Sequence, residues 1–213
     1  MRRQRKPASR YTYQPLQSGC IRISTIFACS DNSKLRIRLH THELNSLPFY
    51  NALSYCWGKG PIDKACFCDD GASAGVLRIS NNLLQALMRI RKINKDISIW
   101  IDQICIDQQN NKEKAHQVQL MGQVYSKASQ VVVWLGPADG GTALAFGLLE
   151  SVAKQVEHHI KTGPDISDDR NNKYYPLDLS SADSSEWLAF RAIFDRPWFS
   201  WLCFFKRLHC LRR

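Results

Sequence analysis

Hydrophobic residues along this chain follow either the spacing of a strand or the spacing of a helix. Segments of the two kinds alternate, as they do in an α/β protein. A β-branched and aromatic run at 97–101 predicts a strand. Apolar residues then recur at spacings of three and four as far as Ala128, which predicts an amphipathic helix over 111–128. A second apolar strand follows at 130–135 and ends before Gly136 and Pro137. The two strands are therefore predicted to be parallel and adjacent at the centre of a sheet, the second one covered on both faces.

Polar residues at the boundaries of these elements indicate a cap and a candidate site. Asn110 is placed to cap the helix, and Glu113 lies three residues later, where its carboxylate can reach back to the N–H of the cap. Asp102 directly follows the strand at 97–101, at the edge of the sheet where α/β proteins bind ligands. Asp102 either binds a ligand there or braces the loop at 105–109.

The remaining pattern predicts further strands and helices on either side of this unit. Alternating residues at 21–24 and 35–40 predict two half-exposed strands joined around 31–33, as a hairpin before the main sheet or at its edge. Residues 52–57 form a central strand, and 66–69 with 76–79 a small hairpin. Helices are predicted after Ser80, after Thr142, and after Ser184 or Ser185. Residues 161–185 are rich in Asp, Ser, Asn and Pro, which predicts a loop or a disordered insertion.

Several candidate sites are weak when each is considered alone. The glycine-rich turn at 58–61 could approach a phosphate, but it lacks a complete nucleotide-binding pattern and a tight loop is the simpler interpretation. Cys66 and Cys68 form one pair, and structural zinc needs more ligands, so no metal is expected. Cys105 lies between two isoleucines, which favours a buried, unreactive thiol.

Composition and charge bound the class of protein. The 213 residues are 44% hydrophobic and 23% charged, as in a soluble globular domain. The formal net charge of +10 is concentrated in both ends of the sequence, which argues against a specific nucleic-acid surface on the folded part. No apolar run is long enough for a transmembrane segment, and residues 1–10 lack the core of a secretory signal. We therefore expect a cytoplasmic protein whose eight cysteines are reduced.

Four blocks of sequence, in order, resemble the fungal heterokaryon-incompatibility (HET) domain. The first two are Ala-Leu-Ser-Tyr-Cys-Trp-Gly at 52–58 and Ile-Ser-Asn-Asn-Leu-Leu-Gln-Ala-Leu at 79–87. The central block begins with Trp-Ile-Asp-Gln-Ile-Cys-Ile-Asp-Gln at 100–108 and continues through Glu113 to 136, and the last opens with Arg-Pro-Trp-Phe-Ser at 196–200. The candidate pocket or motif residues in these blocks are Ser54, Tyr55, Trp57, Gly58, Asp102, Cys105, Gln108 and Glu113. Tyr55 and Gly58 end a strand at the presumed ligand edge and are the preferred pocket-wall residues.

The resemblance implies a fold and a function. The order of blocks is also similar, more remotely, to a TIR domain, which implies a TIR- or flavodoxin-like α/β fold: a mainly parallel sheet flanked by helices, with an N-terminal β-hairpin. HET domains imply signalling in non-self recognition and programmed cell death through self-association or partner domains. The TIR-like alternative is an NAD hydrolase, with NAD as its substrate. The family's Gln-Glu helix is absent after Ser200, so we expect the signalling function, with no catalytic residue assigned.

The resemblance also predicts a division of the chain. Residues 1–15 are expected to form a disordered basic tail, and 16–200 the HET domain, with the motif-bearing core at 49–136. Residues 201–213 diverge from the family as a basic and apolar tail. This ending is interpreted as a truncated or altered gene product, or alternatively as an interfacial membrane helix.

Overall fold

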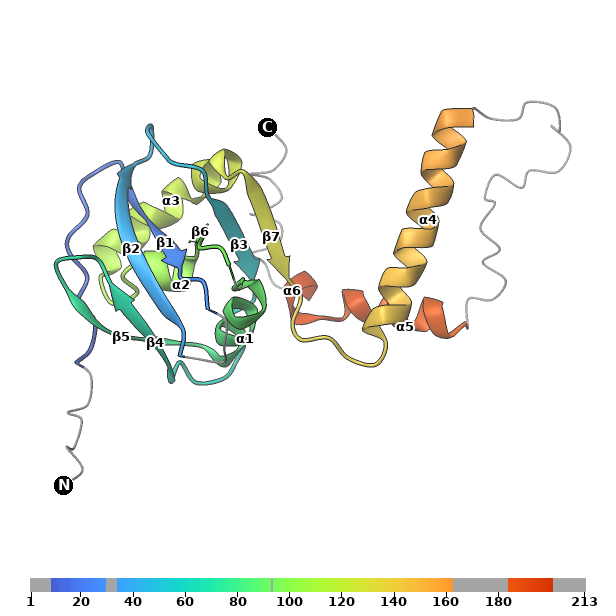
Figure 1. The fold of residues 1–213 in the computed structure, drawn as a ribbon, viewed down its shortest axis with the longest axis horizontal. Helices are drawn as coiled ribbons and strands as arrows, with labels where there is room; N and C mark the ends of the chain where they lie inside the picture. The colour runs from blue at the N-terminus through green and yellow to red at the C-terminus, as the bar shows by residue number, and fades with distance from the viewer. Residues whose placement is uncertain (1–8, 30–33, 93, 163–183, 201–213) are drawn as a thin grey trace, which may run out of the picture. The chain divides into compact units, whose positions relative to one another are not determined.

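The computed structural model describes residues 9–29, 34–92, 94–162 and 184–200. These residues divide into two units, with the boundary in the sequence between residues 136 and 137. The first unit contains a seven-stranded sheet in the order β5-β4-β2-β1-β6-β3-β7 (Figure 1). The strands are β1 (Cys20–Ile26), β2 (Arg36–Glu43), β3 (Asn51–Tyr55), β4 (Lys64–Asp69), β5 (Ala74–Ile79), β6 (Ile97–Trp100) and β7 (Gln130–Trp134). The helices of this unit are α1 (Asn81–Ile90), α2 (Asp102–Cys105) and α3 (Asn111–Lys127).

The predicted α/β class is confirmed, and the sheet is mixed. In the described residues, β3 is parallel to both β6 and β7, and β2 is parallel to β4. The three pairings β1–β2, β1–β6 and β4–β5 are antiparallel. The three strands β6, β3 and β7, which carry motif blocks, are therefore parallel to one another at one end of the sheet.

The predicted adjacency of the strands around α3 is wrong, although their parallel direction is confirmed. β3 lies between β6 and β7, so β7 is an edge strand (Figure 1). Val133 of β7 is 43% exposed, which contradicts the expected cover on both faces. A right-handed crossover fixes the direction of the strands it joins but leaves room for a third strand between them. β3 fills that position, and its last four residues are buried there.

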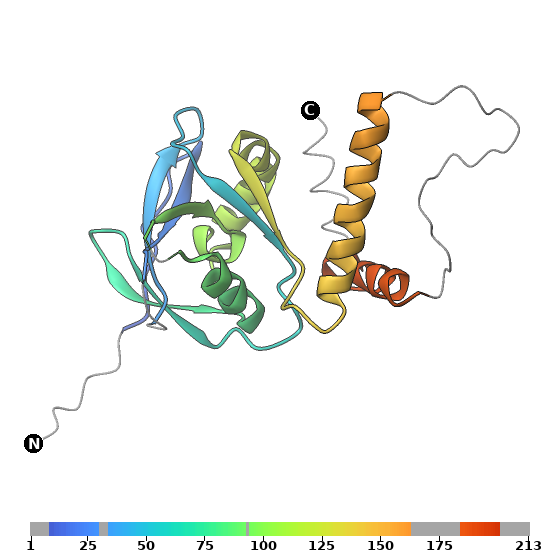
Figure 2. The ribbon, with the colours of Figure 1, turned by 45° about the vertical axis from the view of Figure 1, so that its right-hand side comes forward.

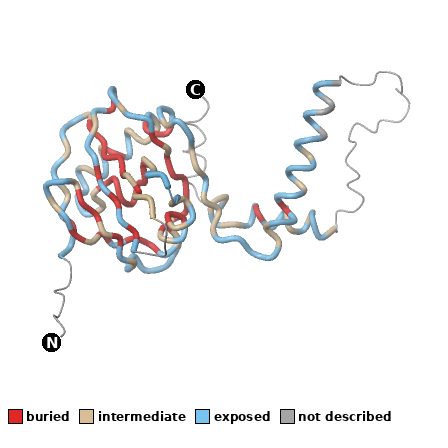
Figure 3. Tube along the Cα trace, in the orientation of Figure 1, coloured by how far each residue is buried: buried red, intermediate tan, exposed pale blue. Residues whose placement is uncertain are grey.

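The N-terminal hairpin is confirmed, but it lies in the interior of the sheet instead of at its edge. β1 pairs with β2 on one side and with β6 on the other. The expectation of half-exposed strands is wrong for β1, in which Arg22 and Ser24 are buried along with their apolar neighbours. Figure 3 shows how the buried positions gather in the part of the chain that forms the sheet. A strand with partners on both edges has little surface left, and its polar side chains must then find internal partners. The predicted turn at 31–33 lies outside the described residues.

The predicted small hairpin is also confirmed as β4 and β5, and the start of the chain lies along it. Residue 10 forms a parallel bridge with Val76, through the bonds Tyr11 N–H to the Val76 carbonyl (3.1 Å) and Val76 N–H to the Ser9 carbonyl (2.8 Å). Gly75 allows this approach, because a Cβ at this position would lie 2.5 Å from the Tyr11 nitrogen. The segment predicted as a disordered tail, 1–15, thus includes residues 9–15, which the structure places against the sheet.

Helices α1 and α3 lie on opposite faces of the sheet, whose strong twist is visible in Figure 2. The Trp100 ring of β6 packs edge-on against Tyr125 of α3, with ring centroids 5.5 Å apart. The Trp134 indole N–H of β7 donates to the Asn82 side chain of α1 (2.9 Å). Since Trp100 is in register with Ala52 and Trp134 with Tyr55, these two tryptophans point to opposite faces. The predicted caps of α1 and α3 are confirmed. The Ser80 side chain accepts a hydrogen bond from the Leu83 N–H, and the Asn110 side chain accepts one from the Glu113 N–H.

The second unit, residues 137–200, consists of helices in its described part. These are α4 (Thr142–Thr162), α5 (Ser185–Phe194) and α6 (Pro197–Ser200). Ser184 caps α5 by accepting from the Trp187 N–H, as predicted. Thr142 is the first helical residue rather than the predicted cap, and its hydroxyl pairs with Asp139, which also binds Arg196 (2.8 Å). Most of the predicted insertion at 161–185 and all of the tail at 201–213 lie outside the described residues.

Candidate functional site

Trp57 and Asp102 meet just beyond the ends of the parallel strands β3 and β6. The Trp57 indole N–H donates to Asp102 Oδ2 at 3.0 Å, and the backbone N–H of Gln103 donates to Oδ1 at 2.8 Å. Asp102 is buried as the first residue of α2. This carboxylate therefore ties the end of one strand to the turn that follows the other. Both carboxylate oxygens thus accept hydrogen bonds from within the domain, one from Trp57 and one from Gln103.

Gln108 closes the loop of the central motif. Its Nε2 donates to the backbone carbonyl of Asp102 at 2.8 Å. This bond joins the beginning of the loop to its end across α2, whose four residues are all buried. The loop at 105–109 is thereby held against the sheet.

Cys105 lies at the centre of the same loop and is fully buried. Its Sγ accepts the Ile101 N–H at 3.4 Å, and its carbonyl accepts from Arg22 at 3.1 Å. Burial raises the pKa of the thiol to about 12, so the sulfur stays protonated near neutral pH. A protonated, inaccessible thiol is a poor nucleophile, in keeping with the predicted packing role.

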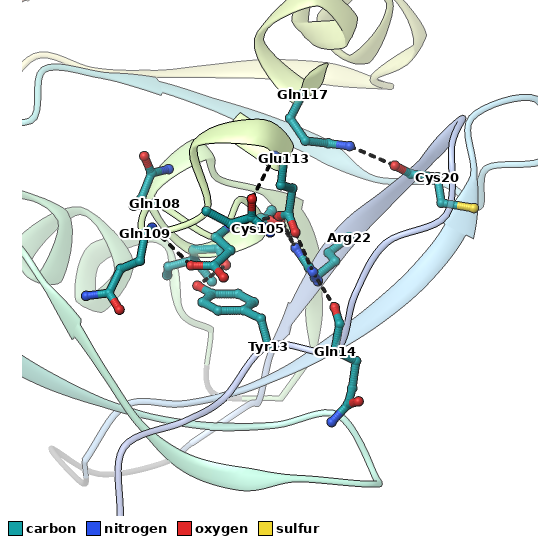
Figure 4. Close-up of polar contacts among 12 residues, drawn as sticks. Tyr13, Gln14, Cys20, Arg22, Cys105, Gln108, Gln109, Glu113 and Gln117 are labelled. Carbon is teal, nitrogen blue, oxygen red and sulfur yellow. Dashed lines mark hydrogen bonds and ion pairs between the residues drawn. The ribbon is translucent and has the colours of Figure 1, made fainter. Parts of the chain in front are cut away.

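Glu113 forms a buried ion pair with Arg22 of β1, a residue that lies 91 positions away in sequence (Figure 4). Arg22 Nη1 donates to Oε1 at 2.6 Å, and Nη2 donates to Oε2 at 3.1 Å. The side chains are only 3% and 8% exposed. Nη2 also donates to the Gln14 carbonyl at 2.6 Å, and the guanidinium lies 4.8 Å from the centroid of the Tyr13 ring. The pair thus links β1, α3, the N-terminal segment and the 105–107 loop.

The predicted reach of Glu113 to the N–H of its own cap residue is wrong. Glu113 Oε1 accepts the N–H of Asp107 at 2.8 Å, while the Asn110 N–H donates to the Asp107 carbonyl. A buried guanidinium is the stronger attraction for the carboxylate, because an unpaired charge in the interior is far more costly than an exposed N–H. The carboxylate therefore turns towards Arg22, and half of the capping box is realised.

The other motif residues contribute in different ways. Ser54 and Tyr55 are buried in β3. Gly58, three residues after the end of β3, has a φ of 77°, a left-handed conformation that suits glycine. Gln117, which sequence reasoning missed, donates from α3 to the Cys20 carbonyl at 2.8 Å.

Arg22 and Tyr13 were also missed, although an arginine in a strand of isoleucines was a detectable signal. The alternating pattern assigned Arg22 to a solvent-exposed face, and nothing in the sequence links it to an acid 91 positions later. Tyr13 lies in the segment predicted to be disordered. Its hydroxyl donates to the Ile104 carbonyl at 2.8 Å, and burial raises its pKa.

A cleft of about 750 Å³ opens beside this network. Its lining comes from residues 10–13 and 76–78, from Gln103 and 107–109, and from Ile62. Of the predicted motif residues, Gln108 is part of this lining, whereas Tyr55, Trp57 and Gly58 are not. The cleft therefore combines one motif block with the N-terminal segment.

In the described part of the chain, no group of three or more His, Cys, Asp or Glu side chains is placed to hold a metal ion. The six cysteines within it, Cys66 and Cys68 included, form no disulfide bond with one another. None of its helices has the length and apolar character needed to cross a bilayer.

The motif blocks and the α/β unit that carries them define a fungal incompatibility domain. Residues 50–202 match the family described as "Heterokaryon incompatibility protein (HET)", and the chain belongs to this family. It is 41% identical over 126 residues to "Heterokaryon incompatibility protein 6, OR allele" of Neurospora crassa. That alignment covers 55% of this chain and 18% of the relative, so the chain spans less than a fifth of the length of this curated protein. No solved structure matches the chain.

Proposed function

We propose that this chain is a signalling module of heterokaryon incompatibility that works by binding further copies of itself or partner domains, in a response to non-self that ends in cell death. Its family and its Neurospora relative support the incompatibility part of this proposal. The mode of action is inferred from the chain's own surface.

The proposed association rests on an exposed apolar face of α4. Leu149, Val156 and Ile160 follow one another at spacings of seven and four, so they lie on one side of the helix. All three are exposed, and Ile160 is 76% exposed. Lys154 and Lys161 form ion pairs with Glu150 and Glu157 at i,i+4 spacing beside this face. An exposed apolar stripe bordered by charges is typical of a protein-binding helix.

The internal contacts of the motif block support a structural role for its polar residues. Asp102 and Glu113 both accept hydrogen bonds from within the domain, and the Cys105 thiol is protonated and buried. Residues committed to such contacts hold the loop and α3 in place. This use fits a module that presents a surface to other proteins.

The association is tested with the full chain by analytical ultracentrifugation over a range of concentrations. We expect a reversible oligomer, and Ile160→Glu should shift it towards monomer by placing a charge in the apolar contact. Ser151→Glu is the matched control, because Ser151 is an exposed residue on the opposite side of the same helix. A native chain that stays monomeric at the highest concentration, or equal effects of the two variants, would contradict self-association.

Partner binding is tested in hyphae. Expression of the chain should lower the viability of a filamentous fungus, and Ile160→Glu should relieve the effect while Ser151→Glu should not. Equal toxicity of all three forms, at equal protein levels, would contradict a role for this face.

A further inference from the structure

The cleft between the N-terminal segment and the central motif block has the features of a small-molecule site. Its volume of about 750 Å³ lies in the range of ligand pockets, roughly 300–1,000 Å³. Its lining joins parts of the chain about 90 residues apart, residues 10–13 on the one hand and Gln103 and 107–109 on the other. Residues 10–13 precede the family match, which begins at residue 50, whereas 76–78 and the motif block lie within it. The motif block is thus shared with the family, while residues 10–13 lie outside the matched region.

Gln103, a residue of the lining, carries a buried hydrogen-bond donor that has no partner. The residue is 5% exposed. Oε1 accepts the Ser80 N–H at 2.9 Å, which fixes the orientation of the amide. Nε2 has no hydrogen-bond partner within the part of the chain that is described. A buried donor without a partner is costly, and a ligand acceptor such as a carbonyl, a ring nitrogen or a phosphate oxygen would satisfy it.

Charged and aromatic residues of the lining narrow the class of ligand that the cleft would bind. Arg10 and Arg78 belong to the lining, against one acid, Asp107, so the charge of the lining favours an anion. Tyr11 and Tyr13 are an edge-to-face pair with centroids 5.1 Å apart. Both phenols donate within the domain, to Asp70 and to the Ile104 carbonyl, so the rings are fixed in place. Tyr11 is 3% exposed and Tyr13 is half-buried, so Tyr13 is the ring that can offer part of its surface to a planar group.

We propose that this cleft binds a planar nitrogen heterocycle that carries a phosphate, the chemistry of a mononucleotide. Gln103 Nε2 donates to an acceptor of the ligand, and Arg10 and Arg78 attract its phosphate. Gln108 and Gln109 supply amide groups that can pair with the edge of a heterocycle. This binding does not depend on the association proposed for α4, which involves other residues.

The probe is adenosine monophosphate, titrated into the full chain in a calorimeter at low ionic strength. Adenosine and ribose 5-phosphate are its two halves, and each lacks one of the groups that the cleft is proposed to recognise. We expect saturable binding of the whole molecule and at least about tenfold weaker binding of each half, the loss that corresponds to one charge-assisted hydrogen bond. Absence of saturable binding, or ribose 5-phosphate binding as tightly as adenosine monophosphate, would overturn the proposal.

Substitutions of residues that line the cleft test whether the binding takes place there. Gln103→Glu keeps an acceptor for the Ser80 N–H but removes the donor and adds a negative charge, so affinity should fall by at least about tenfold. Arg10→Gln/Arg78→Gln changes two exposed side chains and should cause a similar loss without unfolding. The matched control, Arg89→Gln/Lys92→Gln, removes the same charge outside the cleft and should bind like the native chain. If the lining variants bind as the native chain does, or the control loses as much affinity as they do, the site is refuted.

Discussion

Removal of the Glu113 carboxylate tests whether the Arg22–Glu113 pair holds the motif loop in place. Glu113→Ala leaves a guanidinium that is 97% buried without its counter-charge, because the Arg22 side chain is 3% exposed. Breaking a buried pair in this way costs roughly 3–5 kcal/mol. The Asp107 N–H loses its acceptor in the same variant, which by itself costs about 1–3 kcal/mol. The two losses overlap, so we expect a total near the upper end of the first range.

This loss is large compared with the total free energy of unfolding, about 5–15 kcal/mol for a natural domain. At roughly 2–4 °C per kcal/mol for a chain of this size, the melting temperature should fall by about 10 °C or more. Urea unfolding followed by circular dichroism measures the free energy directly. Glu113→Gln should cost less than Glu113→Ala, because its amide oxygen can still accept the Asp107 N–H.

Two controls separate the buried pair from a general effect of charge. Glu150→Ala removes the exposed partner of Lys154, whose ion pair is 2.8 Å long, and should change stability by no more than about 0.5 kcal/mol. Arg22→Met/Glu113→Leu removes both charges and should be more stable than Glu113→Ala alone. A loss below about 1 kcal/mol in Glu113→Ala, or a double variant less stable than the single one, would refute the reasoning.

Three further outcomes follow from single contacts. Asn110→Ala removes the cap of α3 and should lower the free energy of unfolding by about 1 kcal/mol in urea titration; no measurable loss would count against the cap. Gly75→Ala places a Cβ 2.5 Å from the Tyr11 nitrogen, so the N-terminal segment should detach and become more sensitive to limited proteolysis than in the native chain; an unchanged cleavage pattern would argue against this packing. Because burial raises the pKa of Cys105 to about 12, iodoacetamide at pH 8 should modify half-buried Cys29 well before Cys105, as read by mass spectrometry of the folded chain; the reverse order would disprove it.

The local elements of this protein follow from its sequence, because short-range chemistry determines them. The caps at Ser80 and Asn110 each need a side-chain oxygen three residues before the N–H that it accepts. The two antiparallel hairpins need only alternating apolar residues around a turn. The motif blocks identify the family for a similar reason, since each is a continuous run of residues.

The order of strands and the polar network were decided only by the tertiary structure. Periodicity says that β7 is apolar but not that β3 separates it from β6, because a crossover connection leaves the strand order open. It assigns Arg22 to solvent, because the pattern of one strand cannot show that both of its edges are paired. The ion pair with Glu113 and the cleft at Gln103 join segments about 90 residues apart. Such contacts depend on which surfaces the fold brings together and on the high cost of a buried charge without a partner.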